Sequence, residues 1–199
     1  MKKKLAIPPQ LQVSEGGGSF MNNARLGMYL FVATEFMLFA GIIAGYFILR
    51  TSNNNFKDYN PLPLGFTPFN TVLLVLSSVS LFIAQKSISK NDINLFKIAT
   101  YTTFILGLIF FVLQIFEWKE LQLTSFYATD NNNNGMFYLL SGLHGVHVFG
   151  GILMLALLTI RVSRNYFNIK RKNYVAVTGI YWHFVTALWL LLFLILFVI

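Results

Sequence analysis

The chain has 199 residues, of which 56% are hydrophobic and only 11% are charged, and its mean hydropathy is positive. This composition excludes a soluble globular domain and is typical of an integral membrane protein. The formal net charge of +8 could suggest a nucleic-acid binder, but the basic residues are grouped on alternate connections, and such a distribution reports membrane topology instead.

Residues 1–20 are predicted to form a flexible cytoplasmic tail. They are polar and contain Pro8, Pro9 and the glycines at 16–18, and they lack the apolar core of a cleavable signal peptide. We therefore expect the first membrane span to act as the insertion signal, and a single transmembrane domain to fill residues 21–199.

Five apolar runs follow the tail, and each is close to the ~20 residues that cross a hydrocarbon core as a helix. They predict an all-α fold, an integral membrane bundle of five transmembrane helices without a transporter-type internal repeat. The predicted spans are about 26–49, 68–85, 97–116, 137–160 and 177–199.

Two connections are rich in residues that favour loops. The 51–67 segment combines three consecutive asparagines with two prolines, and Pro68 can be accommodated in the first turn of the second span. Asp130 is followed by four asparagines and Gly135. Both segments are predicted to be outer loops.

The distribution of positive charge predicts the orientation of the bundle. Twelve of the fifteen lysines and arginines lie in the N-terminal tail and in the connections at 86–97 and 161–172, counting residues at the boundaries. By the positive-inside rule, the N-terminus is expected in the cytoplasm and the C-terminus outside, which an odd number of spans permits. The 161–172 cluster is also suited to attracting anionic phospholipids.

Glu35 is the only formally charged side chain in the first apolar run, which lies between Arg25 and Arg50. A charge at the centre of a bilayer costs roughly 2.5 kcal/mol or more, so such groups usually face a protein interior or a water path. Glu35 is therefore a candidate functional residue. The alternative interpretation is a protonated acid that holds neighbouring helices together.

All three histidines lie within or at the edge of spans, His144 and His147 in the fourth and His183 in the fifth. With a rise of ~1.5 Å per residue, Glu35, His147 and His183 fall at similar depths, which suggests one polar cluster. His144 lies nearer the outer end, close to the level of Glu117, which we expect to close the third span. These two residues could form a second pair.

Three interpretations of this constellation are open from the residues alone. Imidazoles from two spans could hold a metal or a haem. Glu35 and the histidines could relay protons, or they could form buried hydrogen bonds that fix the register of the helices. Since the chain has no cysteine, a thiolate metal site and an iron–sulfur cluster are excluded.

Five short motifs, taken in order, carry a resemblance to a known family. They are the 27–41 segment around Glu35, the next helix with Asn70, Thr71, Ser77 and Ser78, the third-span residues Gln114, Phe116 and Glu117, the paired-histidine segment 142–148, and the closing segment 181–189. In this order they resemble subunit III of the haem-copper oxidases. The likeness covers about residues 26–199, nearly everything except the tail.

The chain departs from the family pattern in two places. Family members commonly carry aspartate at the position of Thr186, so an acid-dependent contact there is not carried over. Many members also have seven spans, with two extra ones before the equivalent of Glu35, and this chain resembles the short five-span form. The cleft between the two helix groups of the longer form, where lipids bind, is therefore expected to be missing or completed by a neighbouring subunit.

The resemblance implies a non-catalytic accessory subunit of an aerobic terminal oxidase, which reduces oxygen to water and pumps protons across a bacterial cytoplasmic (inner) membrane. Such a subunit binds no cofactor itself and supports the integrity and proton uptake of the catalytic subunit. The partners it implies are oxidase subunits I and II, which would hold the haem and copper, membrane phospholipids and a larger respiratory supercomplex, but no nucleic acid. No residue is given a catalytic, cofactor-binding or metal-binding role, and the candidates for buried polar or subunit-interface roles are Glu35, His144, His147, His183, Glu117, Trp182 and Trp189.

Other functions are kept as alternatives. The same resemblance would serve an accessory subunit of a quinol oxidase or of a nitric oxide reductase. From a different class, the chain could be a small di-histidine haem or metal protein that transfers electrons itself. A proton-coupled transporter is disfavoured by the absence of an internal repeat.

Overall fold

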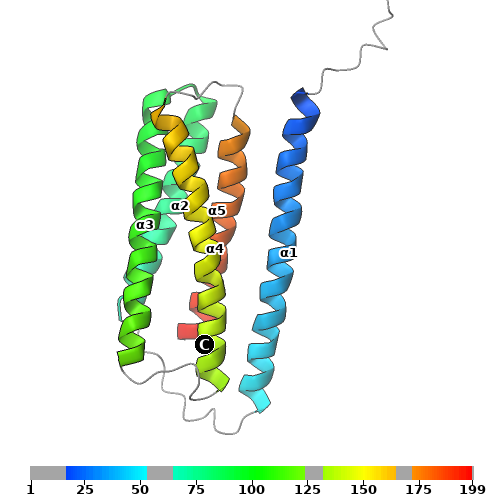
Figure 1. Ribbon diagram of the computed structural model, residues 1–199, viewed down its shortest axis with the longest axis vertical. Coiled ribbons are helices and arrows are strands. Elements are labelled where there is room, and N and C mark those ends of the chain that lie inside the picture. The colour runs from blue at the N-terminus through cyan, green and yellow to red at the C-terminus, as the bar shows by residue number, and fades with distance from the viewer. Residues whose placement is uncertain (1–16, 53–64, 124–131, 165–171, 199) are drawn as a thin grey trace, which may run out of the picture.

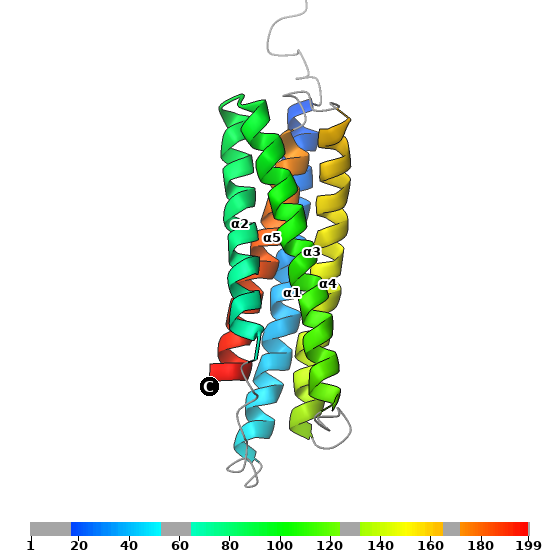
Figure 2. The same ribbon diagram turned by 90° about the vertical axis from the view of Figure 1, so that its left-hand side faces the viewer.

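The computed structural model describes residues 17–52, 65–123, 132–164 and 172–198. Five long helices run alternately up and down the long axis of the molecule (Figures 1 and 2). Each is long and apolar enough to cross a membrane, which confirms the predicted all-α bundle of five spans. The helices are α1 (Gly17–Ser52), α2 (Thr67–Ser89), α3 (Ile93–Leu123), α4 (Asn132–Ser163) and α5 (Lys172–Phe193), which continues into a π-helical turn, η4 (Leu194–Val198).

Parts of the predicted connections lie outside the described residues. These parts are residues 1–16 of the predicted tail, 53–64 of the predicted outer loop at 51–67, 130–131 of the predicted loop at the asparagine run, and 165–171 of the basic connection at 161–172. The last residues of the predicted tail belong to α1, which begins at Gly17. Pro68 stands in the first turn of α2, as expected from the tolerance of helix N-termini for proline.

The helices extend beyond the apolar runs, and this corrects two local expectations. α4 begins at Asn132, so the asparagine run is largely helical and not a loop, and the side chain of Asn134 is buried. α3 continues to Leu123, so Glu117 lies inside the helix and does not close it. The physical reason is that hydropathy delimits the hydrocarbon crossing, whereas a packed helix continues past it as long as its neighbours support it.

The connection between α2 and α3 is a tight turn, much shorter than the basic loop predicted at 86–97. The backbone nitrogen of Lys90 donates to the carbonyl oxygens of Lys86 and Ser87, which closes α2. Asn91 then takes a left-handed conformation with φ of 60°, which asparagine tolerates better than most residues. The carboxylate of Asp92 accepts from the backbone nitrogen of Leu95 at 3.0 Å and caps α3.

α5 is the central helix of the bundle and α1 is peripheral. In the most apolar window of α5, 56% of the residues are buried, against 17% in α1. α1 packs against α4 and α5 on one side of the molecule, while α2 and α3 form the opposite side (Figure 1). Residues of α5 are therefore placed to contact groups of α1, α2 and α4.

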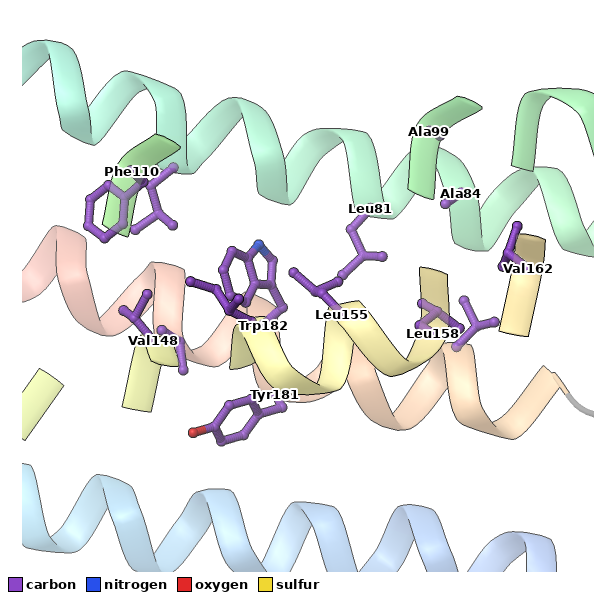
Figure 3. Packing of buried hydrophobic residues seen from close by; sticks show 14 of the residues in the cluster. Leu81, Ala84, Ala99, Phe110, Val148, Leu155, Leu158, Val162, Tyr181 and Trp182 are labelled. Carbon is purple, nitrogen blue, oxygen red and sulfur yellow. The ribbon is translucent and has the colours of Figure 1, made fainter. Parts of the chain in front are cut away.

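Trp182 of α5 fills the centre of the largest buried cluster. Its side chain is fully buried and lies near Val148 and Leu155 of α4 and Leu81 of α2 (Figure 3). Two glycines make room for the indole: a Cβ atom on Gly151 would lie 2.7 Å from the ring, and one on Gly107 would lie 2.8 Å from it. Such small residues let membrane helices approach closely, which is how they pack without a hydrophobic driving force.

Gly151→Ala should destabilise the bundle by ~1–3 kcal/mol, because the added methyl group meets the rigid ring of Trp182. Gly142→Ala on the same helix is the matched control, since a Cβ atom there meets no other heavy atom within 4 Å. We expect Gly142→Ala to be neutral or stabilising, given the helix preference of alanine over glycine. Thermal unfolding of the two variants in detergent would compare them, and equal loss of stability would contradict the packing argument.

Candidate functional site

Glu35 and His147 form a pair between α1 and α4. The Oε2 atom of Glu35 lies 2.9 Å from Nε2 of His147. Both side chains are largely withdrawn from the surface, with 18% of Glu35 and 12% of His147 exposed. The contact joins the only acid of the first apolar run to a histidine of the fourth, as their similar predicted depths in the membrane suggested.

The hydrogen positions of this pair follow from its acceptors. Nδ1 of His147 lies 2.7 Å from the carbonyl oxygen of Leu143, which can only accept, so Nδ1 carries a hydrogen. Nε2 then either accepts from a protonated Glu35 or, in an imidazolium, donates to its carboxylate. In both cases the two groups share one proton and the pair is neutral overall. A neutral pair is far cheaper to bury than a lone carboxylate.

Aromatic residues enclose this pair from α1 and α5. The ring of Phe39 meets the imidazole of His147 edge-on, with centroids 5.2 Å apart. The hydroxyl of Tyr181 donates to the backbone carbonyl of His147 at 3.0 Å, and its side chain points toward α1 in Figure 3. α1 and α4 therefore hold the imidazole, and α5 is tied to the backbone of the same residue.

His183 lies in a different polar group, between α5 and α2. Its Nδ1 atom is 2.6 Å from the hydroxyl of Ser78, and its Nε2 atom is 3.4 Å from Oε1 of Gln85. If Ser78 donates to Nδ1, the neutral tautomer with hydrogen on Nε2 satisfies both contacts. Gly179 lies against the Gln85 amide, and any Cβ atom there would overlap it.

Glu117 belongs to a third group, near the end of the bundle where α2 begins. One carboxylate oxygen accepts from the hydroxyl of Thr67, and the other accepts from the Gln114 amide at 3.1 Å. The amide of Asn70 donates to Oε1 of Gln114 at 3.4 Å and to the carbonyl oxygen of Phe110 at 3.3 Å. This network joins α2 to α3.

His144 is fully buried and stacks on Trp189 of α5, with ring centroids 5.0 Å apart and planes inclined by 26°. Neither of its ring nitrogens makes a hydrogen bond with the described residues. Trp189 in turn donates from Nε1 to the hydroxyl of Thr71 at 3.0 Å. His144 is thus held by ring packing, and its contacts do not include Glu117.

The structure confirms one of the predicted contacts among the acids and histidines and contradicts the others. The Glu35 and His147 contact is confirmed, but His183 does not join it, and the predicted pair of His144 with Glu117 is wrong. Depth along a span does not fix the face on which a residue lies. Tyr181 and His183 differ by two residues, or about 200° around the helix, so one faces α1 and the other faces α2.

The geometry favours hydrogen bonding and proton sharing over metal or haem binding. Within the part of the chain that the structure describes, no group of three or more potential metal ligands comes together. Nε2 of His147 is engaged by Glu35, and the His144 ring stacks on Trp189. Thr186 is also satisfied locally, since its hydroxyl donates to the carbonyl oxygen of Trp182 at 2.9 Å.

Sequence reasoning missed several partners of the candidate residues. Trp182 donates from Nε1 to the hydroxyl of Ser77 at 3.0 Å, and Ser78 and Gln85 hold His183. The signal that could have identified them is an uncharged polar side chain inside an apolar span. Such a group needs a partner in the membrane for the same reason that Glu35 does.

Comparison with known proteins identifies relatives over nearly the whole chain. The profile of the family described as "Cytochrome c oxidase subunit III" matches residues 17–199. The chain is 31% identical to cytochrome c oxidase subunit 3 of Thermostichus vulcanus, over 87% of this chain and 86% of that protein. It is 28% identical to the probable cytochrome c oxidase subunit 3 of Mycobacterium bovis, over 86% of each chain, and 33% identical to the Rattus norvegicus subunit, over 85% of this chain and 67% of that one.

Proposed function

Because the chain belongs to the cytochrome c oxidase subunit III family, and is therefore an accessory subunit of a haem-copper oxidase, we propose that it supports the integrity and proton uptake of the catalytic subunit without holding a redox centre. It works in a complex with other oxidase subunits. We infer that these partners include subunits I and II, that they hold the haem and copper, and that phospholipids and a larger respiratory supercomplex complete the assembly.

The observation that carries this proposal is the 2.9 Å contact between Glu35 of α1 and His147 of α4, together with the contact of His147 Nδ1 with the carbonyl oxygen of Leu143. The pair stays neutral whichever partner holds the proton, so the proton can move between them without burying a net charge. A group of this kind is suited to stabilising a helix bundle while exchanging a proton with its surroundings. We infer that the oxygen chemistry belongs to the partner subunits.

We place the chain in the bacterial cytoplasmic membrane with its N-terminus in the cytoplasm. The support is the charge distribution, since the basic residues gather at the end where α1 begins, α2 meets α3, and α4 ends. In this orientation the Glu35 and His147 pair is reached partway across from the cytoplasmic side. That is the side from which an oxidase takes up the protons that it consumes and pumps.

Glu35→Ala tests the accessory role in the purified oxidase. We expect normal haem content and normal initial turnover, followed by faster loss of activity during sustained turnover or by loss of this subunit, because only the support of the partner is weakened. Glu120→Ala is the control, as Glu120 is an exposed acid of α3 outside the pair. Haem spectra, oxygen consumption over time and subunit composition are the measurements. Complete loss of haem from the variant enzyme would count against the proposal.

A further inference from the structure

Three buried side chains carry unpartnered polar atoms near the end of the bundle where α2 and α4 begin and α3 ends (Figures 1 and 2). The atoms are Oδ1 of Asn70 on α2, Nε1 of Trp118 on α3 and both ring nitrogens of His144 on α4, and none of them makes a hydrogen bond with the described residues. Asn70 and His144 are each only 1% exposed. Buried polar atoms are nearly always hydrogen-bonded, to protein or to ordered water, so these atoms call for a partner.

Contacts between the helices place the three side chains in one layer of the bundle. The indole of Trp118 lies against the glycine that follows His144, where a Cβ atom would be 2.9 Å from the ring. The imidazole of His144 stacks on Trp189, and Trp189 donates to the hydroxyl of Thr71, which directly follows Asn70. The unpartnered atoms therefore belong to the same part of the bundle interior, although each side chain comes from a different helix.

The polar side chains next to His144 on its own helix are engaged elsewhere. Ser141, one turn before it, donates to the carbonyl oxygen of Phe137 at 2.7 Å. His147, one turn after it, is held by Glu35. Because the surrounding helices cover His144 almost completely, a ligand of its ring nitrogens has to be small enough to lie inside the bundle.

The unpartnered atoms form a balanced set of donors and acceptors. A neutral imidazole carries one N–H donor and one acceptor nitrogen, the indole of Trp118 adds a donor, and the amide oxygen of Asn70 adds an acceptor. None of these groups carries a formal charge, so the set does not favour an ion. Water both donates and accepts, and it is the usual partner of such buried groups. Since the two nitrogens of an imidazole point in different directions, one water cannot bond to both.

The same layer contains the network of Glu117. The amide nitrogen of Asn70 donates to Gln114, whose own amide donates to the carboxylate of Glu117 at 3.1 Å. A water bound to the free oxygen of Asn70 extends this network toward His144. Glu117 is half-buried, so one end of the network lies near the surface while the other reaches the interior.

We propose that ordered water molecules bind between α2, α3 and α4, where they connect the imidazole of His144 with the indole of Trp118 and the amide oxygen of Asn70. The waters join helices whose side chains do not meet directly in this layer. They also link His144 indirectly to Glu117, with which it makes no direct contact. The site does not depend on the proposed role of Glu35.

A cryo-EM map of the purified wild-type oxidase, at a resolution that shows ordered water elsewhere in the complex, tests the site directly. We expect separate water density within hydrogen-bonding distance of a ring nitrogen of His144, of Nε1 of Trp118 and of Oδ1 of Asn70. A map in which the His144 nitrogens meet only carbon atoms would overturn the proposal. A map in which a partner side chain bonds to these nitrogens would overturn it too.

His144→Phe tests whether the imidazole holds the water. The phenyl ring can still stack on Trp189 but offers no hydrogen-bonding atom, so the density beside the ring should be lost. Thr159→Val is the matched control, since it removes a buried hydroxyl of the same helix that donates to Leu155, and it should retain the water. Unchanged water density in His144→Phe would contradict the proposal. If this variant fails to assemble, the wild-type map still decides, and neither map depends on turnover, so the test is separable from that of Glu35.

Discussion

Trp182→Ala is expected to destabilise the bundle by ~3 kcal/mol. The side chain is fully buried and packs against helices on several sides, so its removal leaves a cavity that rigid neighbours cannot fill. The estimate lies at the low end of the usual range for buried tryptophan. The reason is that separated helices remain in lipid, so no transfer of apolar surface from water is lost and the packing term dominates.

Two further variants divide this effect into its parts. Trp182→Phe keeps most of the ring contacts but loses the hydrogen bond to Ser77. We expect the loss of this hydrogen bond to destabilise the bundle by ~1 kcal/mol, in addition to the effect of the smaller ring. Leu153→Ala, at an α4 residue that is 51% exposed, is the control for removing apolar volume without opening an internal cavity. Pulse proteolysis of the purified oxidase across a denaturant series would give the stability of the chain. Equal effects of Trp182→Ala and Leu153→Ala would contradict the central role of the indole.

The number and type of spans could be predicted because hydropathy over ~20 residues reports directly on the membrane as a solvent. The ends of the helices could not, because they depend on local packing. Asn132 and its neighbours favour loops by composition, yet α4 includes them and buries Asn134. The length of the turn at Asn91 could not be predicted either, because it depends on the local capping of α3 by Asp92.

The sequence predicts the depth of the candidate residues in the membrane, but not the helix face on which each of them lies. Rise per residue placed Glu35 and His147 at the same level, and the structure joins them. The rise per residue could not show that His183 faces α2, because the direction in which a side chain points depends on how its helix is rotated against its neighbours. That rotation is set by contacts such as Gly151 against Trp182, in which a glycine is informative only once its partner is known.

Glu35→Ala and His147→Ala should each destabilise the chain by ~2 kcal/mol, since each leaves a buried polar partner unsatisfied. The double variant should cost less than the sum of the two, with a coupling energy of ~1–2 kcal/mol, in the range of strong hydrogen bonds between membrane helices. The same pulse proteolysis assay gives all four values of the cycle. Additive effects would show that the contact at 2.9 Å contributes nothing specific.

Glu35→Gln distinguishes the two ways in which the pair can hold its proton. The hydrogen on Nδ1 of His147 is committed to the carbonyl oxygen of Leu143, so a neutral imidazole presents only an acceptor at Nε2. A glutamine amide can donate to that acceptor, as a protonated Glu35 would, and should then retain most of the stability lost in Glu35→Ala. If the resident state is instead a carboxylate facing an imidazolium, Glu35→Gln removes the counter-charge and should be as destabilising as Glu35→Ala. The comparison of these two variants therefore locates the shared proton, and with it the form in which the first span crosses the membrane without a net charge.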